Sequence, residues 1–189
     1  MKKLNLGCYD KKLPGFTNVD IREDVFPDII DDAFSLDTVP NNSIDLIYSS
    51  HMLEHLSYEN TKIALKNWYN KLVKGGILRL AVPDFESVCK RYIYKGEIGE
   101  VLHSVCGSQK HEFDFHYNIF DEKRISDLLK ETGFVSVVRY NWWERDPHKY
   151  CDDFSQSYIP PRERTIALSH GRVQYGDGIL MSLNVEAVK

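Results

Sequence analysis

The run His51-Met52-Leu53-Glu54-His55 carries the densest set of side chains that could do chemistry. Two histidines four residues apart on a helix lie on one face and can share a metal ion. The His-x-x-Glu-His spacing also matches a class of zinc peptidases. Motifs of five residues are weakly specific, and no distant third ligand stands out in the sequence. We therefore expect no metal, and zinc binding is the less favoured alternative.

A second pattern joins a glycine to an acid. Gly7 follows a short apolar run, and Asp20 ends the next one. The dinucleotide fingerprint needs Gly-x-Gly-x-x-Gly with an acid roughly 20 residues further on. The extra glycines are missing here, and Asp20 lies only 13 residues beyond Gly7. A loop that could hold a pyrophosphate is absent, so the pattern disfavours NAD.

Strands and helices alternate in the elements that must position these residues. Short apolar runs bounded by turn residues predict strands at 3–6, 17–21, 28–30, 44–48, 77–82, 134–138 and 179–188. The run 77–82 is nearly continuous, as in a strand buried on both faces of a sheet. The alternation predicts one α/β domain over 1–189, with a Rossmann-like, mostly parallel sheet and a C-terminal antiparallel strand pair.

Helix signals stand between these strands. Ser57 is a cap residue before a helical pattern that reaches Val73, where Lys74-Gly75-Gly76 should end it. A helix is expected at 85–94, and another between Asp121 and Gly133. Only ten residues, 7–16, separate the first two strands, barely enough for a crossover. The N-terminal half of the sheet is therefore predicted to be pared down.

Composition narrows the class of function. The net charge is −4 and no long run of Lys or Arg appears, so a nucleic-acid partner is not expected. No apolar stretch approaches the roughly 20 residues of a membrane span. The four cysteines are scattered without a Cys-x-x-Cys pair, which favours a reducing cytoplasm. The sequence does not determine the oligomeric state, and a homodimer is compatible with it.

Several motifs in order resemble class I S-adenosylmethionine-dependent methyltransferases. They begin with Leu4-Asn5-Leu6-Gly7-Cys8 and Gly15-Phe16-Thr17-Asn18-Val19-Asp20, and continue with the blocks 42–56, 74–78 and 82–84. The blocks 114–117 and 182–187 are similar to a compact subgroup associated with sugar and polysaccharide modification. The family usually has a second glycine where this chain has Tyr9.

The resemblance implies S-adenosylmethionine as the cofactor and places its contacts. Asp20 would accept hydrogen bonds from the ribose hydroxyls, and Asp32 one from the adenine amino group. The backbone at Ala33 and Phe34 would meet the adenine edge, and Ser50 and His51 the methionine part. Glu54 and His55 would help fix this loop. The full cofactor set is Gly7, Cys8, Tyr9, Asp20, Ile21, Asp32, Ala33, Phe34, Ser50 and His51.

Two residues are candidate general bases for methylating an alcohol, which loses its proton as the oxygen attacks. His116 is the first, because histidine titrates near neutrality, although it could instead order an aromatic loop. Asp84 is the second, with capping of the following helix as the alternative.

The remaining segments, 96–120 and 141–178, are expected to form a lobe that faces the substrate. Trp142, Trp143 and the tyrosines of 140–158 would stack on sugars or belong to the core, and Asp152-Asp153 would bind hydroxyls or solvent. The resemblance thus implies an O-methyltransferase that acts on a hydroxyl of a sugar, glycan or nucleotide-sugar. The alternative is a catalytically silent relative that binds the cofactor or a partner protein.

Overall fold

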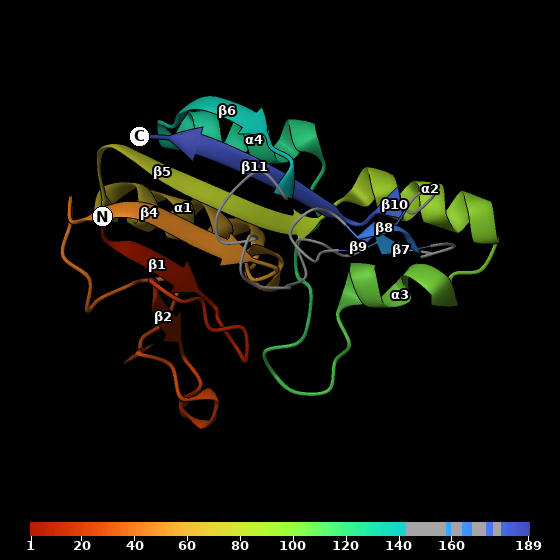
Figure 1. The fold of residues 1–189 in the computed structure, drawn as a ribbon, viewed down its shortest axis with the longest axis horizontal. Coiled ribbons are helices and arrows are strands. Elements are labelled where there is room, and N and C mark those ends of the chain that lie inside the picture. The colour runs from red at the N-terminus through yellow and green to blue at the C-terminus, as the bar shows by residue number, and fades with distance from the viewer. Residues whose placement is uncertain (143–157, 160–163, 168–172, 176–178) are drawn as a thin grey trace.

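A seven-stranded sheet forms the centre of the computed structural model, which describes residues 1–142, 158–159, 164–167, 173–175 and 179–189 (Figure 1). The strand order is β3-β2-β1-β4-β5-β11-β6. The strands are β1 (Lys3–Leu6), β2 (Thr17–Asp20), β3 (Ile29–Ile30), β4 (Ile44–Ser50), β5 (Leu72–Pro83), β6 (Val135–Arg139) and β11 (Ser182–Val188). Two short pairs lie outside this sheet, β7 (Tyr158–Ile159) with β10 (Ile179–Leu180) and β8 (Arg164–Ala167) with β9 (Val173–Tyr175).

Strands β1 to β5 pair in parallel, whereas β11 runs antiparallel to both β5 and β6. The predicted Rossmann-like sheet with a C-terminal antiparallel pair is therefore confirmed. The pared-down N-terminal half is also confirmed. The connections between β1, β2, β3 and β4 carry only the 3-10 turn η1 (Glu23–Val25), and the first α-helix follows β4.

The helices come from the second part of the chain. They are α1 (Tyr58–Lys71), α2 (Phe85–Lys95), α3 (Gly99–Cys106) and α4 (Glu122–Thr132), and the 3-10 turn η2 (Leu53–His55) precedes α1. Helices α1 and α4 lie on the same face of the sheet, behind it in Figure 1. They cover the main apolar core, in which Leu65, Trp68 and Leu129 are fully buried.

The opposite face of the sheet carries polar side chains beside the buried Tyr48 and Ala81, since side chains alternate between the two faces along each strand. Asn5 donates to the side chain of neighbouring Asn18 at 3.0 Å, and both are buried. Arg79 of β5 forms an ion pair with Glu186 of β11 at 2.6 Å. The expectation that 77–82 is buried on both faces is largely confirmed, since Leu78, Leu80, Ala81 and Val82 are at most 1% exposed and the Arg79 side chain is 12% exposed.

Several helix boundaries follow local chemistry. The side chain of Ser57 accepts from Asn60 N and caps α1, and Asp121 caps α4 in the same way. Gly133 ends α4 at φ +116°, as predicted. Lys74-Gly75-Gly76 does not end α1, because the helix stops at Lys71 and β5 begins at once. Instead, Gly75 N donates to Lys189 O, which fixes the end of the C-terminal strand.

Two other expectations differ from the structure. The final strand is interrupted at Met181, because the residues before it pair with β7 and the residues after it pair with β5 and β6. Helix α3 was not predicted within the Gly- and His-rich segment 96–120. Within the described ranges, no helix has the length and apolar character to cross a membrane.

Candidate functional site

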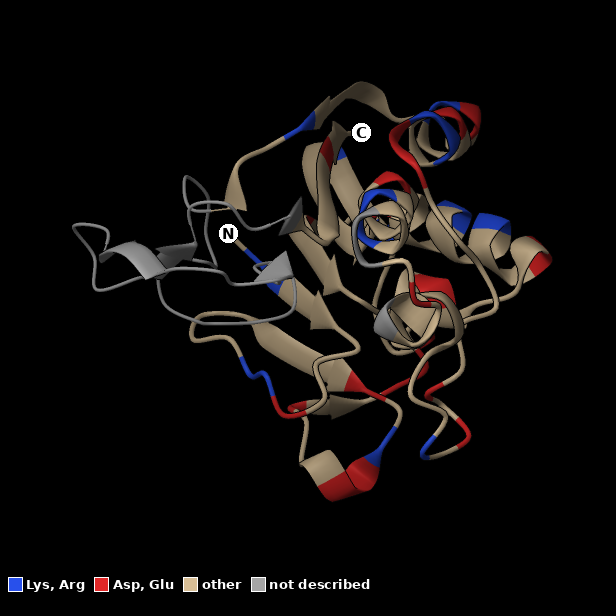
Figure 2. Ribbon diagram, turned by 90° about the vertical axis from the view of Figure 1, so that its right-hand side faces the viewer, with Lys and Arg blue, Asp and Glu red and all other residues tan. Residues whose placement is uncertain are grey.

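The parallel strands end at one edge of the sheet, and the predicted site residues gather there. Gly7 follows β1, Asp20 ends β2, Ser50 ends β4 and Asp84 follows β5. Figure 2 looks onto these strand ends. Neighbouring strands lie about 4.8 Å apart, so Asp20 and Ser50, two strands apart, are separated by roughly 10 Å along the edge.

Gly7 adopts φ +64°, a conformation that side chains disfavour. A Cβ atom at this position would lie 2.5 Å from Met52 Cγ and 2.9 Å from Met52 Cβ. Glycine is thus required by the turn and by the approach of the segment after β4. Next to it, Cys8 is buried, and burial followed by the charge of Asp20 raises the pKa of its thiol to about 12. Cys8 is a neutral packing residue.

Tyr9 also has a left-handed backbone, with φ +44°. Its ring is 46% exposed, and the guanidinium of Arg22 lies 5.2 Å from the ring centroid. The ring therefore stands at the surface beside Arg22. Tyr9 N donates to Asp20 Oδ2 at 2.8 Å, and Arg22 N donates to Asp20 Oδ1 at 2.9 Å. Each oxygen keeps acceptor capacity, so Asp20 is oriented for further donors.

Ile21 is 46% exposed directly after Asp20, an apolar surface at the strand end. Hydrogen bonds within the segment after β3 and to helix α1 hold this segment in place. Asp32 Oδ1 accepts from Phe34 N at 2.8 Å, while Ala33 O accepts from Trp68 Nε1 at 2.7 Å. Phe34 O accepts from Asn67 at 3.0 Å. Helix α1 thus holds the predicted adenine-binding backbone, and its carbonyls already have donors.

Ser50 is the last residue of β4, and His51 follows it at the edge where the neighbouring parallel strands also end. Ser50 Oγ is buried and makes no hydrogen bond to any described residue. His51 has φ +51°, an uncommon conformation for a non-glycine residue, and such outliers cluster at functional sites. Its Nε2 lies 2.6 Å from Ser182 Oγ and its Nδ1 lies 3.2 Å from Glu54 Oε1.

Glu54 is a functional candidate beyond the loop-fixing role that the resemblance implies. It is 1% exposed on η2 and lies beside His55 and His116. Burial pushes its pKa upward, but close His51 and the charges of His55 and His116 outweigh burial and lower the pKa. Burial lowers the pKa of His116, against the opposing effect of Glu54. The structure therefore favours an ionised Glu54 carboxylate and a neutral His116 imidazole.

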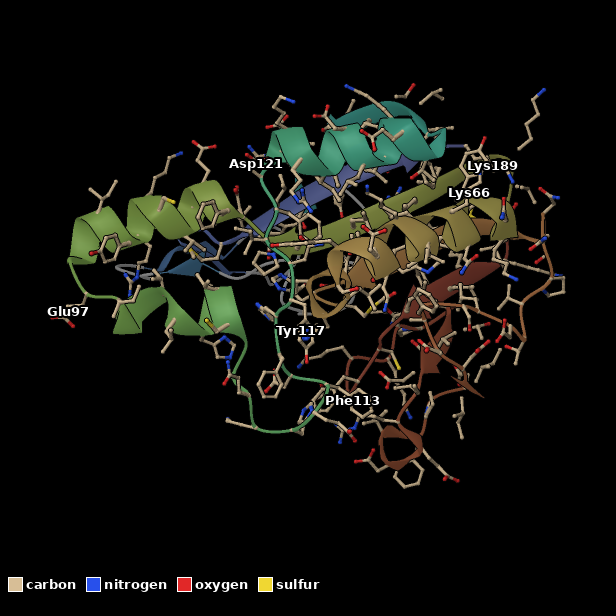
Figure 3. The ribbon with its side chains drawn as sticks, turned by 180° about the vertical axis from the view of Figure 1, so that it is seen from behind. Lys66, Glu97, Phe113, Tyr117, Asp121 and Lys189 are labelled. Atoms are coloured by element: carbon tan, nitrogen blue, oxygen red, sulfur yellow. The ribbon has the colours of Figure 1, made fainter. Side chains whose placement is uncertain are left out.

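The loop between α3 and α4 brings His116 to this place. Tyr117 N and Asn118 N both donate to Glu54 O, at 2.9 and 3.1 Å, and Asn118 Nδ2 donates to Thr61 of α1. Figure 3 shows Tyr117 on the part of this loop that passes the start of α1. A Cβ at Gly107 would lie 2.1 Å from Asp114 O, so the loop also needs this glycine.

The lowered pKa of His116 predicts a pH-dependent stability. The unfolded chain, with a histidine pKa near 6.5, takes up a proton more readily than the folded chain. The neutral His116 side chain therefore contributes fully to the free energy of unfolding above pH 6.5. This contribution is lost as the pH falls from 6.5 through the lower pKa of the folded state. Urea unfolding between pH 5 and 8 should show this loss. We expect the free energy of unfolding of His116→Asn to fall less between pH 8 and pH 5 than that of the wild type. The same pH dependence in both proteins would contradict the prediction.

Asp84 has a structural role in this arrangement. Its Oδ1 accepts from Glu86 N and caps α2, and its Oδ2 forms an ion pair with Arg139 at 2.8 Å. The capping alternative is confirmed. As a base, Asp84 stays a prediction, with both oxygens already in use.

Part of the predicted substrate-facing lobe lies outside the described residues. Trp143, Tyr150, Cys151 and Asp152-Asp153-Phe154-Ser155 all belong to this part. Trp142 is described, and it is 1% exposed, which favours a core role over a sugar-stacking surface at this position. Cys8, Cys89 and Cys106 are free thiols.

Comparison with known proteins agrees with this fold. Residues 17–80 match a family model described as a methyltransferase domain. No curated protein matches the sequence. An S-adenosylmethionine-dependent methyltransferase of Archaeoglobus fulgidus is similar over the whole chain and 86% of its own length, with a TM-score of 0.58 at 17% identity.

Two further solved structures are similar to this fold. A methyltransferase of Thermotoga maritima, titled a possible histamine N-methyltransferase, has a TM-score of 0.59 at 18% identity, and the match covers this chain fully and 82% of that one. A methyltransferase of Methanosarcina mazei has a TM-score of 0.58 at 16% identity, with 100% and 92% covered. The predicted fold of class I methyltransferases is therefore confirmed, and residues 17–80 are similar to a methyltransferase domain.

Proposed function

We propose that this methyltransferase-domain chain is an O-methyltransferase that acts on a hydroxyl of a sugar, glycan or nucleotide-sugar. The proposal depends chiefly on one observation. At the edge where the parallel strands end, the oriented carboxylate of Asp20 and the unpartnered hydroxyl of Ser50 flank the positive-φ turn at Gly7.

The candidate binding residues follow one another across the sheet in the same order as the linked parts of S-adenosylmethionine. Asp32 lies on the outermost strand connection, Asp20 on the next strand and Ser50 beyond Gly7. Adenine, ribose and the methionine part would meet these positions in turn. The roughly 10 Å between Asp20 and Ser50 suits a nucleoside joined to an amino acid. Exposed Ile21 offers an apolar surface to the adenine ring.

When bound, S-adenosylmethionine supplies the methyl group, and the protein supplies orientation and a place for the hydroxyl proton. His116 Nδ1 lies 3.1 Å from Ser104 O, so this nitrogen carries a hydrogen and donates it. The lone pair is left on Nε2. A neutral imidazole with a lowered pKa is able to accept a proton at neutral pH.

The acceptor class has weaker support than the methyl donor. A sugar hydroxyl is favoured by the subgroup resemblance of the blocks 114–117 and 182–187. Ser182 contacts His51 at 2.6 Å, so the second block reaches the site. The solved relative from Thermotoga maritima is titled a possible histamine N-methyltransferase, and amine acceptors therefore belong in the screen.

Calorimetric titration with S-adenosylmethionine tests this proposal. We expect the wild type to bind, and Asp20→Ala to bind about 10- to 100-fold more weakly, since hydrogen bonds to a charged group contribute about 1.5–3 kcal/mol. Asp127→Ala removes the same charge from the exposed face of α4 and should bind normally. Absence of binding by the wild type would remove the proposal. Binding without turnover on any acceptor would favour the silent alternative.

A further inference from the structure

The group of Glu54, His55 and His116 has the composition of a metal site. One potential ligand atom from each residue lies within 4.8 Å of the others. The two imidazole rings stand edge to face, with centroids 4.8 Å apart. Two residues come from η2, whereas His116 comes from the loop that Glu54 O anchors. The motif His51-x-x-Glu54-His55 thus has the distant third ligand that the sequence did not reveal.

Both histidines are held in the orientation that a metal ligand needs. His55 Nδ1 lies 3.0 Å from Phe115 O, and His116 Nδ1 lies 3.1 Å from Ser104 O. A carbonyl accepts only, so each Nδ1 carries the hydrogen and each Nε2 keeps its lone pair. Metal-binding histidines usually donate their other nitrogen to a carbonyl or carboxylate in this way.

Glu54 provides an independent observation. Its side chain is 1% exposed, and neither carboxylate oxygen accepts a hydrogen bond from the described part of the chain. The 3.2 Å contact of Oε1 with His51 Nδ1 is an ion-pair distance in poor hydrogen-bond geometry. Among the described residues the Glu54 carboxylate has only the His51 contact, and burying a carboxylate with so little compensation is strongly unfavourable. A cation bound beside Glu54 would supply the missing compensation.

We infer that Glu54, His55 and His116 bind one divalent transition-metal ion of the Zn²⁺ type. Two imidazoles and a carboxylate suit zinc and its neighbours, whereas Mg²⁺ prefers oxygen ligands. Zinc bonds of 2.0–2.1 Å place tetrahedral ligands about 3.4 Å apart, so the three side chains draw together on binding. Three protein ligands leave a fourth position open, as in catalytic zinc sites. His51 is a positioning residue that contacts the ligand Glu54.

The catalytic role of this ion rests on the proposed function, while its binding does not. A hydroxyl in the open position is acidified by the metal and loses its proton to solvent. Its oxygen then bonds to the methyl carbon, and the carbon–sulfur bond breaks with its electron pair going to sulfur. His116 Nε2 would be a metal ligand in this state, so the ion replaces His116 as the group that activates the hydroxyl.

Zinc titration in competition with a chromophoric chelator tests the site on the full chain. We expect one equivalent to bind to the wild type, and at least 10-fold weaker binding in Glu54→Gln and His116→Ala. His103→Ala, an exposed histidine on α3, is the matched control and should bind normally. No stoichiometric binding by the wild type would overturn the inference. Binding that the three variants leave equal would do the same, because it would be adventitious.

Cobalt provides a readout that a merely structural role would not change. The wild type loaded with Co²⁺ should show the visible absorption of a low-coordinate site. His116→Cys should keep the ion and gain a thiolate-to-cobalt band, and absence of that band would contradict ligation by residue 116. Calorimetry with S-adenosylmethionine on the same samples separates the two hypotheses. Metal binding without cofactor binding would leave the site standing and remove the proposed function.

Discussion

Gly7→Ala is expected to destabilise the fold by about 2–5 kcal/mol and to abolish measurable S-adenosylmethionine binding. A left-handed conformation costs alanine about 1–2 kcal/mol, and overpacking adds about 1–3 kcal/mol. The overlap is direct, because the new Cβ would lie 2.5 Å from Met52 Cγ. Relief of this overlap displaces either the turn after β1 or the segment after β4, and both border the cofactor positions. Urea unfolding and calorimetry would measure the two effects.

A double-mutant cycle with Met52→Ala separates the two causes. Removing the Met52 side chain relieves the overlap but leaves the backbone conformation at φ +64°. Neighbouring residues commonly show interaction energies of about 0.5–3 kcal/mol. We expect Gly7→Ala to be less destabilising in the Met52→Ala background. Additive effects would show that the approach of Met52 does not explain the glycine.

His116→Ala is expected to lower turnover by about 10²- to 10⁴-fold, the range of general acid–base catalysis, and to leave S-adenosylmethionine affinity unchanged. The side chain belongs to the loop at Glu54 and makes its hydrogen bond with Ser104 O, away from Asp20 and Gly7. Single-turnover methylation of the best acceptor and calorimetry would measure the two quantities. Unchanged turnover would exclude every catalytic role of His116, and His103→Ala is the control.

The pH profile and a chelator distinguish the two possible roles of His116. A general base would give an acid limb at its pKa, which burial lowers from the usual value, and a chelator would have no effect. A metal ligand predicts inactivation by a chelator and recovery with zinc. It also predicts that His116→Cys retains more activity than His116→Ala, since a thiolate is a zinc ligand.

Much of the sheet was predictable because its signals are local. Apolar runs marked β1, β2 and β4, and cap residues placed α1 and α4 within one or two residues. The end of α1 was misjudged because Gly75 was interpreted as a helix cap, although its position is set by a hydrogen bond to Lys189 at the other end of the chain. Helix α3 lacks a side-chain cap, which removed its clearest sequence signal.

The part of the candidate site that lies at the ends of the parallel strands was predictable from the sequence. Asp20 and Ser50 follow from the rule that parallel strands end at one edge, and Gly7 follows from the turn. The pairing of His116 with Glu54 was not predictable, because it depends on backbone hydrogen bonds between segments about 60 residues apart. No spacing rule covers such a contact. Arg139, which engages Asp84 from β6, was missed for the same reason.

The helix-free connections of β1, β2 and β3 have a consequence for how ligand binding and folding are coupled. This margin of the sheet has few residues in the main core, so local opening should cost least there. It is also the margin that bears Asp20, Ile21 and Asp32. A nucleoside bound across these strands would take the place of the helices that these connections lack. Part of its binding free energy would then appear as slower hydrogen exchange of the backbone amides in residues 17–36.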